Sequence, residues 1–216
     1  MAEIAINEYR GVRKICGADV TENDSGYSGG TWRRLFGAQG ITVTPNESTE
    51  THYYDNKAAI QIDTEGAIES VMTVSVPALK TRAWIDGKTF SEATGAYIGT
   101  PSKKGYKAYC FIGAKDDGTE ELNIFYKGKF TGGATTHNTR DDGTEATNME
   151  YTFGAVYTAN NIAKDEDGNP CACNRYILPL TDPTWEDKIL GVFTAGESTL
   201  EVMTPDEIEK LLSTAA

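Results

Sequence analysis

The sequence has few of the residues on which most enzyme and metal sites depend. Among 216 residues there are only two histidines, His52 and His137, and neither lies beside a nucleophile motif such as G-x-S-x-G. The chain also lacks a P-loop, a G-x-G-x-x-G turn after a predicted strand and an H-E-x-x-H helix. We therefore expect no catalytic site and no cofactor. A hydrolase built on a carboxylate pair stays as a minority alternative, because acidic residues are plentiful on the turns.

Cysteine is also scarce, and its four positions match no common metal or disulfide pattern. Four cysteines in a chain of this length are too few for a disulfide scaffold, so we expect all of them to be reduced. Cys171 and Cys173 are separated by a single residue, whereas zinc ligands usually come as C-x₂₋₄-C pairs. A closed zinc site would also require Cys16 and Cys110 to converge on that loop. The sequence therefore predicts no metal.

The chain has no excess of positive charge and no long apolar run. It carries 20 basic and 32 acidic side chains, a net charge of −12, whereas proteins that bind a phosphate backbone present basic patches. The start of the chain is too charged for a signal peptide, and the longest uncharged apolar stretch, 70–79, is about half of a membrane span. We expect a soluble protein that is made in the cytosol and has no membrane partner.

The acidic excess is unevenly distributed along the chain. Residues 1–40 hold five basic and five acidic side chains, whereas residues 41–216 hold fifteen basic and twenty-seven acidic ones. One interpretation is a solvated acidic face that keeps the protein soluble. The other is a surface that repels a second polyanion. Composition alone does not decide between them.

Alternation of apolar and polar residues predicts a mainly β protein. The clearest case runs from Met149 to Tyr157, where every second residue is apolar or aromatic. Asp-Gly pairs, which supply the positive φ of tight hairpin turns, occur at 117–118, 142–143 and 167–168. We expect antiparallel meanders and hairpins in a single domain over residues 1–216, since no linker divides the chain. The other predicted strands are 41–44, 58–63, 71–76, 106–112 and 122–130.

Short helices are predicted at three places. The first covers 76–86, with Ser75 as its cap and Gly87 as its C-terminal stop. The second begins near Asp182 and ends at Gly191. The third follows in the C-terminal part of the chain.

This last predicted helix is amphipathic. Thr204 begins it with a capping box, and the apolar residues that follow fall on one face. Such a face has to dock, either on its own domain or on a neighbouring subunit. The candidate inter-subunit contacts here are Ile208, Leu211 and Leu212.

Residues 19–36 are predicted to be a long loop between two strands. The part from 21 to 30 has too little apolar surface to offset the entropy of ordering, about 1–2 kcal/mol per residue. The part that follows combines aromatic, arginine and apolar side chains of the types enriched at interface hot spots. These candidate contact residues are Trp32, Arg33, Arg34, Leu35 and Phe36.

One interpretation of this composition is an arm that orders only on assembly and joins one subunit to its neighbours. The alternative is a mobile surface loop whose Trp32 and Phe36 tuck into the core of their own subunit.

A series of short stretches has a characteristic order and spacing. Residues 11–18 look like a first strand, and residues 37–46 look like a strand that returns after a long loop. Together with the later stretches, over residues 7 to 160, they resemble the major tail proteins, the tail-tube family of long-tailed bacteriophages with non-contractile tails. The later stretches are 53–58, 69–74, 97–99, 107–109, 126–130 and 151–154.

The resemblance implies a β-sandwich or small barrel of antiparallel strands, with a flanking α-helix and short C-terminal helices. Six subunits would close a ring, and stacked rings would form the tube through which genomic DNA leaves the capsid. The DNA would pass without specific binding. Residues 161–216 depart from the family and are expected to be a C-terminal elaboration.

The resemblance also implies partners and a location. The partners would be other copies of the chain, the tape measure protein, and the tail terminator and distal tail proteins. The protein would be assembled in the bacterial cytoplasm and end in the tail of the virion. One alternative of another class is a β-sandwich module that binds carbohydrate, which would expose aromatic side chains such as Trp84 or Trp185 on a concave face.

Overall fold

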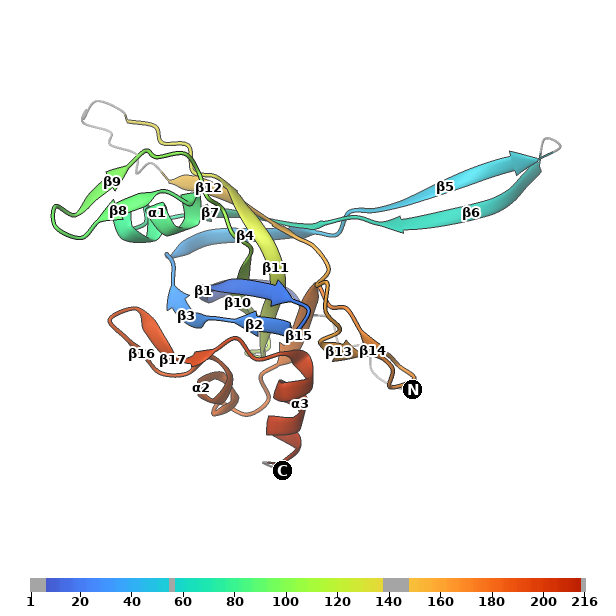
Figure 1. Ribbon diagram of the computed structural model, residues 1–216. Helices are drawn as coiled ribbons and strands as arrows, with labels where there is room; N and C mark the ends of the chain where they lie inside the picture. Colours follow the sequence, from blue (N-terminus) through green and yellow to red (C-terminus); the bar gives the residue numbers. More distant parts are fainter. Residues whose placement is uncertain (1–6, 55–56, 138–147, 215–216) are drawn as a thin grey trace.

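Figure 1 shows the computed structural model of the chain, which describes residues 7–54, 57–137 and 148–214. Strands dominate and three short helices interrupt them, as the residue pattern predicted. The strands are β1 (Tyr9–Asn23), β2 (Gly26–Gly29), β3 (Thr31–Arg34), β4 (Ala38–Thr44), β5 (Glu47–Tyr54), β6 (Lys57–Glu65), β7 (Ile68–Val74), β8 (Thr89–Ser91), β9 (Ala96–Ile98), β10 (Lys107–Lys115), β11 (Glu120–Gly132), β12 (Met149–Ala155), β13 (Ala163–Lys164), β14 (Pro170–Cys171), β15 (Arg175–Pro179), β16 (Phe193–Thr194) and β17 (Glu197–Glu201). The helices are α1 (Leu79–Asp86), α2 (Trp185–Leu190) and α3 (Pro205–Ser213).

Eleven of the described strands form one antiparallel sheet that curls into a half-barrel (Figure 1). Its main path runs β16-β17-β3-β1-β10-β11-β12-β7-β4, with β2 beside β1 and β15 beside β11. The predicted fold class, a mainly β sandwich or small barrel with short helices, is confirmed.

Two of the three predicted Asp-Gly turns lie in the described residues. Gly118 has a φ of 84° in the turn from β10 to β11, and Gly168 has a φ of 81° between β13 and β14. Glycine adopts this left-handed conformation without the steric cost that a Cβ would add. The third turn, at 142–143, lies outside the described residues.

The central strands are buried on both faces. Residues 107–113 of β10 are all buried, and alternate side chains enter two different apolar clusters. The inner cluster lies inside the curl and is aromatic. In it, the ring of Tyr109 lies 5.2–5.8 Å, between centroids, from the rings of Phe125, Phe130 and Phe153. Aromatic side chains remove large apolar areas from water, so this cluster stabilises the curl.

A bulge in β11 reverses the side-chain alternation that the sequence suggested. The pattern places Tyr126 and Phe130 on one face, but the first belongs to the outer cluster and the second to the inner one. The pairing of β10 with β11 shifts by one residue between Lys107 and Tyr109, which leaves an extra residue in β11. An extra residue exchanges the two faces of the strand beyond it. Gly128 lies at this shift, where a Cβ would collide with a neighbouring carbonyl oxygen.

The described C-terminal residues, 161–214, cover the outer face of the sheet. Ile189 of α2, Val202 after β17 and Ile208 of α3 are buried in the outer cluster, together with side chains of β1, β10 and β11. The segment that we expected to be an elaboration therefore completes the core of the sheet. Without it, one face of the central strands would be exposed to water.

Helix α1 begins later than predicted. Its first residue is Leu79, and Ser75 does not cap it, because the Ser75 hydroxyl instead accepts a hydrogen bond from the backbone N–H of Gly37. Its predicted end is correct. Gly87 follows the last helical residue in the left-handed conformation, with a φ of 63°.

Helices α2 and α3 follow their predicted signals. α2 lies between Asp182, whose carboxylate accepts a backbone hydrogen bond just before the helix, and Gly191. α3 begins with the predicted capping box. The Thr204 hydroxyl accepts a hydrogen bond from the N–H of Glu207, and the Glu207 carboxylate accepts one from the N–H of Thr204.

Residues 19–36 are not the long loop that the sequence predicted. They complete β1 and form β2 and β3, and both of these strands pair with β1. The polar residues 21–30 are ordered because the hydrogen bonds of a hairpin satisfy their backbone, a contribution that composition does not reveal. The prediction of an arm that orders only on assembly is therefore wrong for this segment.

Three of the five contact candidates in this segment pack within their own subunit. Trp32 is fully buried in the outer cluster, and Leu35 is buried in the inner one. The ring of Phe36 stacks on Tyr151 at 5.8 Å between centroids. The alternative in which Trp32 and Phe36 tuck into the core is correct for these side chains, but they belong to an ordered segment.

Trp32→Ala should therefore destabilise the isolated subunit. The change opens a cavity in the outer cluster, and large-to-small changes of this kind cost about 3–5 kcal/mol. Urea unfolding followed by circular dichroism measures the effect. Arg34→Ala, at an exposed position of the same strand, is the control and should change stability by less than about 0.5 kcal/mol. An unchanged midpoint for Trp32→Ala would contradict the burial.

Candidate assembly surfaces

The described residues offer no cluster suited to a metal. No group of three or more His, Cys, Asp or Glu side chains in the described ranges is placed to hold an ion. Cys16 and Cys110 lie opposite each other on β1 and β10 in the core, whereas Cys171 and Cys173 are half-buried elsewhere, and all four are free thiols. Burial raises the pKa of Cys173 to about 11, so this thiol stays protonated and unreactive at neutral pH.

Several carboxylates in the described part of the chain are held as anions by hydrogen bonds from basic or polar neighbours. Arg13 donates hydrogen bonds to Glu120 at 2.7 Å and to Glu186 at 2.6 Å, and the first of these lowers the pKa of Glu120. Burial opposes the ionisation of Glu186, but hydrogen bonds from Arg13 and Lys14 outweigh it and lower its pKa too. Every described carboxyl group with a shifted pKa is shifted downward. None therefore suits the protonated acid that a glycosidase needs.

The two tryptophans that a carbohydrate-binding face would use are both half-buried. The ring of Trp84 lies 3.7 Å from Nζ of Lys107 and 4.5 Å from the guanidinium carbon of Arg33, measured to the ring centroid. Trp185 packs against the outer cluster. Each ring therefore already has contacts within its own subunit.

Asp19 holds these groups together near the surface. Its carboxylate accepts hydrogen bonds from Nε1 of Trp84 at 2.9 Å and from Nζ of Lys107 at 2.9 Å, and Arg33 lies 3.4 Å away. Burial works to raise the pKa of Asp19, but the hydrogen bonds from Lys107 and Trp84 outweigh it and lower the pKa. The cluster ties β1, β3, α1 and β10 together. Arg33, a candidate contact, thus also serves its own subunit.

A groove rich in lysine opens beside this cluster. It has a volume of about 650 Å³ and lies between α1, β8 and the segment 99–107. We call it the lysine groove; its lining includes Trp84, Lys88, Lys103 and Lys107. Sequence reasoning missed it, although a signal exists. Residues 79–107 carry six basic and two acidic side chains, a net charge of +4 within a chain of −12.

Strands β5 and β6 form a long hairpin that projects from the body (Figure 1). They pair with each other and make a separate two-stranded sheet. β6 has nine residues, which corresponds to a length of about 30 Å. A two-stranded hairpin is only marginally stable alone in water, and this one pairs with no third strand among those that the structure describes. The sequence predicted a strand at 58–63 but not its projection, because alternation does not say what a strand packs against.

The curled sheet is also open. Its two end strands, β4 and β16, each pair on one side only among the described strands. A groove of about 460 Å³ separates β4 from β1, and its lining includes Val12, Ile41 and Phe111. Unpaired strand edges and an apolar groove are sites where another chain can add.

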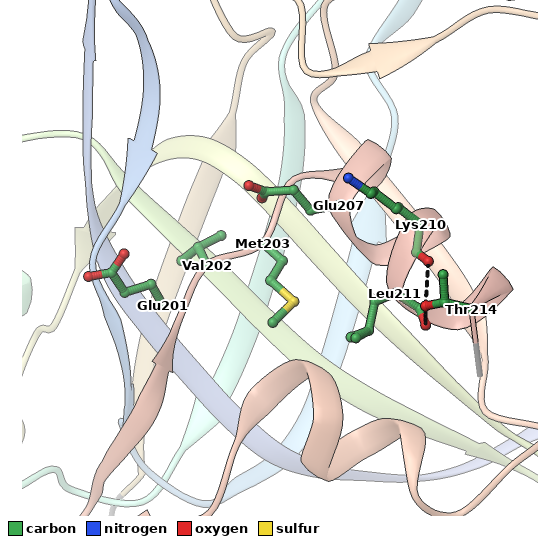
Figure 2. Close-up of a pocket in the computed structure, with 7 residues that line it drawn as sticks. All are labelled: Glu201, Val202, Met203, Glu207, Lys210, Leu211 and Thr214. Carbon is green, nitrogen blue, oxygen red and sulfur yellow. Dashed lines mark hydrogen bonds between the residues drawn. The ribbon is translucent and has the colours of Figure 1, made fainter.

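Figure 2 shows a third groove, of about 480 Å³, between the end of β17 and α3. Leu211 and Met203 contribute its apolar lining, with Glu207 and Lys210 beside them. Of the other two candidate contacts on α3, Ile208 is buried in the outer cluster and Leu212 packs against that cluster. The helix therefore docks on its own domain, which the sequence had left open.

None of the helices in the described ranges is long and apolar enough to cross a membrane. Comparison with protein-family models and with curated proteins finds no match to the chain. The functional argument therefore depends on the fold and on the surfaces described above.

Asp19→Asn should reduce stability at neutral pH and remove part of the acid sensitivity. Because the folded-state pKa of Asp19 lies below its ordinary value of 3.8, the carboxylate stabilises the fold above that value, and this contribution is lost as the pH falls through the folded-state pKa. Since Asp19 is half-exposed, we expect a loss of about 1 kcal/mol at neutral pH.

Urea unfolding of wild type and variant at neutral pH and at a pH of about 3 measures this effect. The difference between the two proteins should narrow at acid pH. Asp24→Asn, in the exposed turn between β1 and β2, is the control. A difference that does not depend on pH would contradict the proposed role of the carboxylate.

Proposed function

We propose that this protein is a structural subunit that polymerises into hexameric rings, which stack into the tail tube of a long-tailed bacteriophage with a non-contractile tail. The observation that carries the proposal is the β5–β6 hairpin, which projects from the body and pairs with no third strand among those described (Figure 1). Such a hairpin is stable when a second chain covers it. In a polymer, each subunit supplies that cover to a neighbour.

The curled sheet supports the same proposal. β4 and β16 leave unpaired edges at its two ends, so one subunit can meet the next through different surfaces. Contacts of this heterologous kind close into rings when the rotation between subunits allows it, and rings can then stack. A mainly β sandwich or small barrel is also the fold that the resemblance to tail-tube proteins implies.

The charge of the chain suits a conduit for DNA. With a net charge of −12, a tube of these subunits would repel the phosphate backbone of a passing duplex. Of the two interpretations of the acidic excess, the proposal therefore favours a surface that repels a polyanion. Genomic DNA would pass without specific binding.

The proposal includes partners and a location. The main partner is the chain itself, and the ends of the tube would meet the tape measure protein, the tail terminator and the distal tail proteins. Assembly would take place in the cytoplasm of the host bacterium, and the mature subunit would reside in the virion tail. The function needs neither a catalytic site nor a cofactor.

Concentrated purified protein should form rings or tubes in electron micrographs, and mass measurement of the rings should give hexamers. A variant in which a short glycine-rich turn replaces residues 49–63 should still fold, because β5 and β6 pair only with each other among the described strands, but it should not form tubes. Urea unfolding of this variant is the control for folding. A strictly monomeric wild type, or normal tubes from the shortened variant, would contradict the proposal.

Assembled tubes should not bind duplex DNA at physiological salt. The Debye length there is about 8 Å, so the repulsion acts where DNA and protein come close together. Filter binding or fluorescence anisotropy with a labelled duplex measures this. A salt-sensitive complex with submicromolar affinity would show that the tube wall attracts DNA.

A further inference from the structure

The groove of about 460 Å³ that separates β4 from β1 opens onto the inner cluster; we call it the β4–β1 groove. Phe111 and Asn123, which are direct partners in the register of β10 and β11, lie on its floor. Ile41 of β4 and Val12 of β1 line its two walls. Phe111 belongs to the inner cluster, and Ile41 and Val12 pack against it. The groove is therefore an apolar opening in the body of the subunit.

Both walls of the β4–β1 groove are strand edges. β4 pairs with β7 on one side only among the described strands. Residues 9–13 of β1 pair with β10, whereas the pairing of β1 with β3 and β2 begins further along, at Cys16 and Val20. A register shift between Arg13 and Cys16 separates these two parts of β1. Each wall therefore presents backbone N–H and C=O groups that pair with no described strand, and such edges can accept another strand.

The size of the β4–β1 groove suits a short extended peptide. A strand rises about 3.3 Å per residue, lies about 4.8 Å from its neighbour and takes up about 10 Å through the sheet, so one residue needs about 160 Å³. A volume of about 460 Å³ therefore holds roughly three residues of an inserted strand. Such a strand would form hydrogen bonds with the walls. A lipid tail would remove the same backbone groups from water and leave them unpaired, at a cost in free energy.

Arg175 supplies the one charged side chain in the described lining of this groove. It is the first residue of β15, and its Nη2 donates a hydrogen bond to Oδ1 of Asn123 at 2.6 Å. Asn123 is only 3% exposed, so this contact fixes the guanidinium against the floor. The guanidinium carbon lies 5.3 Å from the centroid of the Phe125 ring, and Nε is buried without a hydrogen-bond partner. Neutral groups therefore hold this cation in place.

Arg175 has no carboxylate partner within the described part of the chain. None of the ion pairs found there includes it. The carboxylate of Glu121 is engaged elsewhere, because it accepts a hydrogen bond from the Tyr9 hydroxyl at 2.6 Å and pairs with Lys115. Burial lowers the pKa of Arg175, and the charges of Tyr9 and Glu121 only partly offset this effect. An anion from outside would compensate the half-buried guanidinium.

We propose that the β4–β1 groove binds an extended segment of a partner protein in which an acidic residue has apolar residues two positions away on each side. The segment would add as a strand beside β4, with its apolar side chains against Ile41 and Phe111. Its carboxylate would bind the guanidinium of Arg175. The inference goes beyond the proposed function and does not rest on it, because a single subunit contains the whole groove.

The described strands of a second copy do not offer such a segment. Side chains two positions apart point to the same face of a strand, so the groove requires an apolar-x-acidic-x-apolar pattern. Among the described strands this pattern occurs only around Glu69 of β7. β7 already pairs with β12 on one side and with β4 on the other. We therefore assign the segment to another protein.

A series of labelled peptides tests the chemistry of the groove with the wild-type chain. The probe Ser-Val-Thr-Glu-Thr-Val-Ser presents one carboxylate between two valines in either strand direction. Fluorescence anisotropy should show saturable binding, about tenfold or more weaker when glutamine replaces the glutamate. N-methylation of both threonines should also abolish binding, because it removes N–H groups that pair with a wall. Equal binding of the three peptides would overturn the inference.

A substitution in the groove tests the role of the cation. Arg175→Met should weaken binding of the glutamate peptide by about tenfold or more and change the affinity of the glutamine peptide by less than about twofold. Arg34→Met, at an exposed position of β3, is the matched control and should leave both affinities unchanged. Urea unfolding tests whether each variant is folded. Wild-type affinity of folded Arg175→Met for the glutamate peptide would show that the carboxylate binds elsewhere.

Hydrogen exchange measured by mass spectrometry locates the peptide on the wild-type chain. We expect the glutamate peptide to slow exchange in residues 9–13 and 38–44, and exchange that is unchanged at saturation would contradict the proposal. Decanoate serves as the lipid probe, and equal protection by decanoate would identify a site for amphiphiles instead. Protection of 38–44 that rises with protein concentration alone would show that a second copy fills the groove, which would also overturn the inference.

These measurements separate the inference from the proposed function. If wild type forms tubes but binds none of the peptides, the assignment of the groove is wrong while the tube proposal stands. If wild type stays monomeric and binds the glutamate peptide through Arg175, the groove is supported and the tube proposal is contradicted.

Discussion

The burial of the central strands on both faces is the constraint on which the rest of the structure depends. β10 and β11 send aromatic side chains into the inner cluster and further apolar side chains into the outer one. Each of the two apolar faces of such a strand needs a separate cover from other parts of the protein. The curl of the sheet supplies the first, and residues 161–216 supply the second. The bulge near Gly128 also serves this burial. It exchanges the two faces of β11 part-way along the strand, so that side chains of one parity move from one cluster to the other.

Because the body completes its core within one chain, the elements that it leaves unpaired are informative. The β5–β6 hairpin buries no face against another described strand, and β4 and β16 leave edges open. A protein that functioned as a closed monomer would expose backbone groups that favour aggregation. The same features become useful when a second copy supplies the missing contacts, and this is the physical basis for proposing a polymer.

Charge is also distributed unevenly over the chain. With a net charge of −12, two copies of the chain repel each other at long range. Residues 79–107, at +4, and the hairpin 47–65, at −4, reverse that relation locally and on opposite sides of the body.

The sequence alone determined the features that depend on local interactions. Four features each depend on residues only a few positions apart, so the sequence pattern predicts them. They are the Asp-Gly turns, the capping box of Thr204, the helix end at Gly87 and the alternation of β12. The sequence does not distinguish segment 19–36, which pairs with the main sheet, from segment 47–65, which projects from the body. Both are polar, and the first is ordered because Trp32 meets the outer cluster, which distant residues such as Val202 build. The register shift in β11 and the lysine groove likewise depend on which strands meet, so only the tertiary structure decided them.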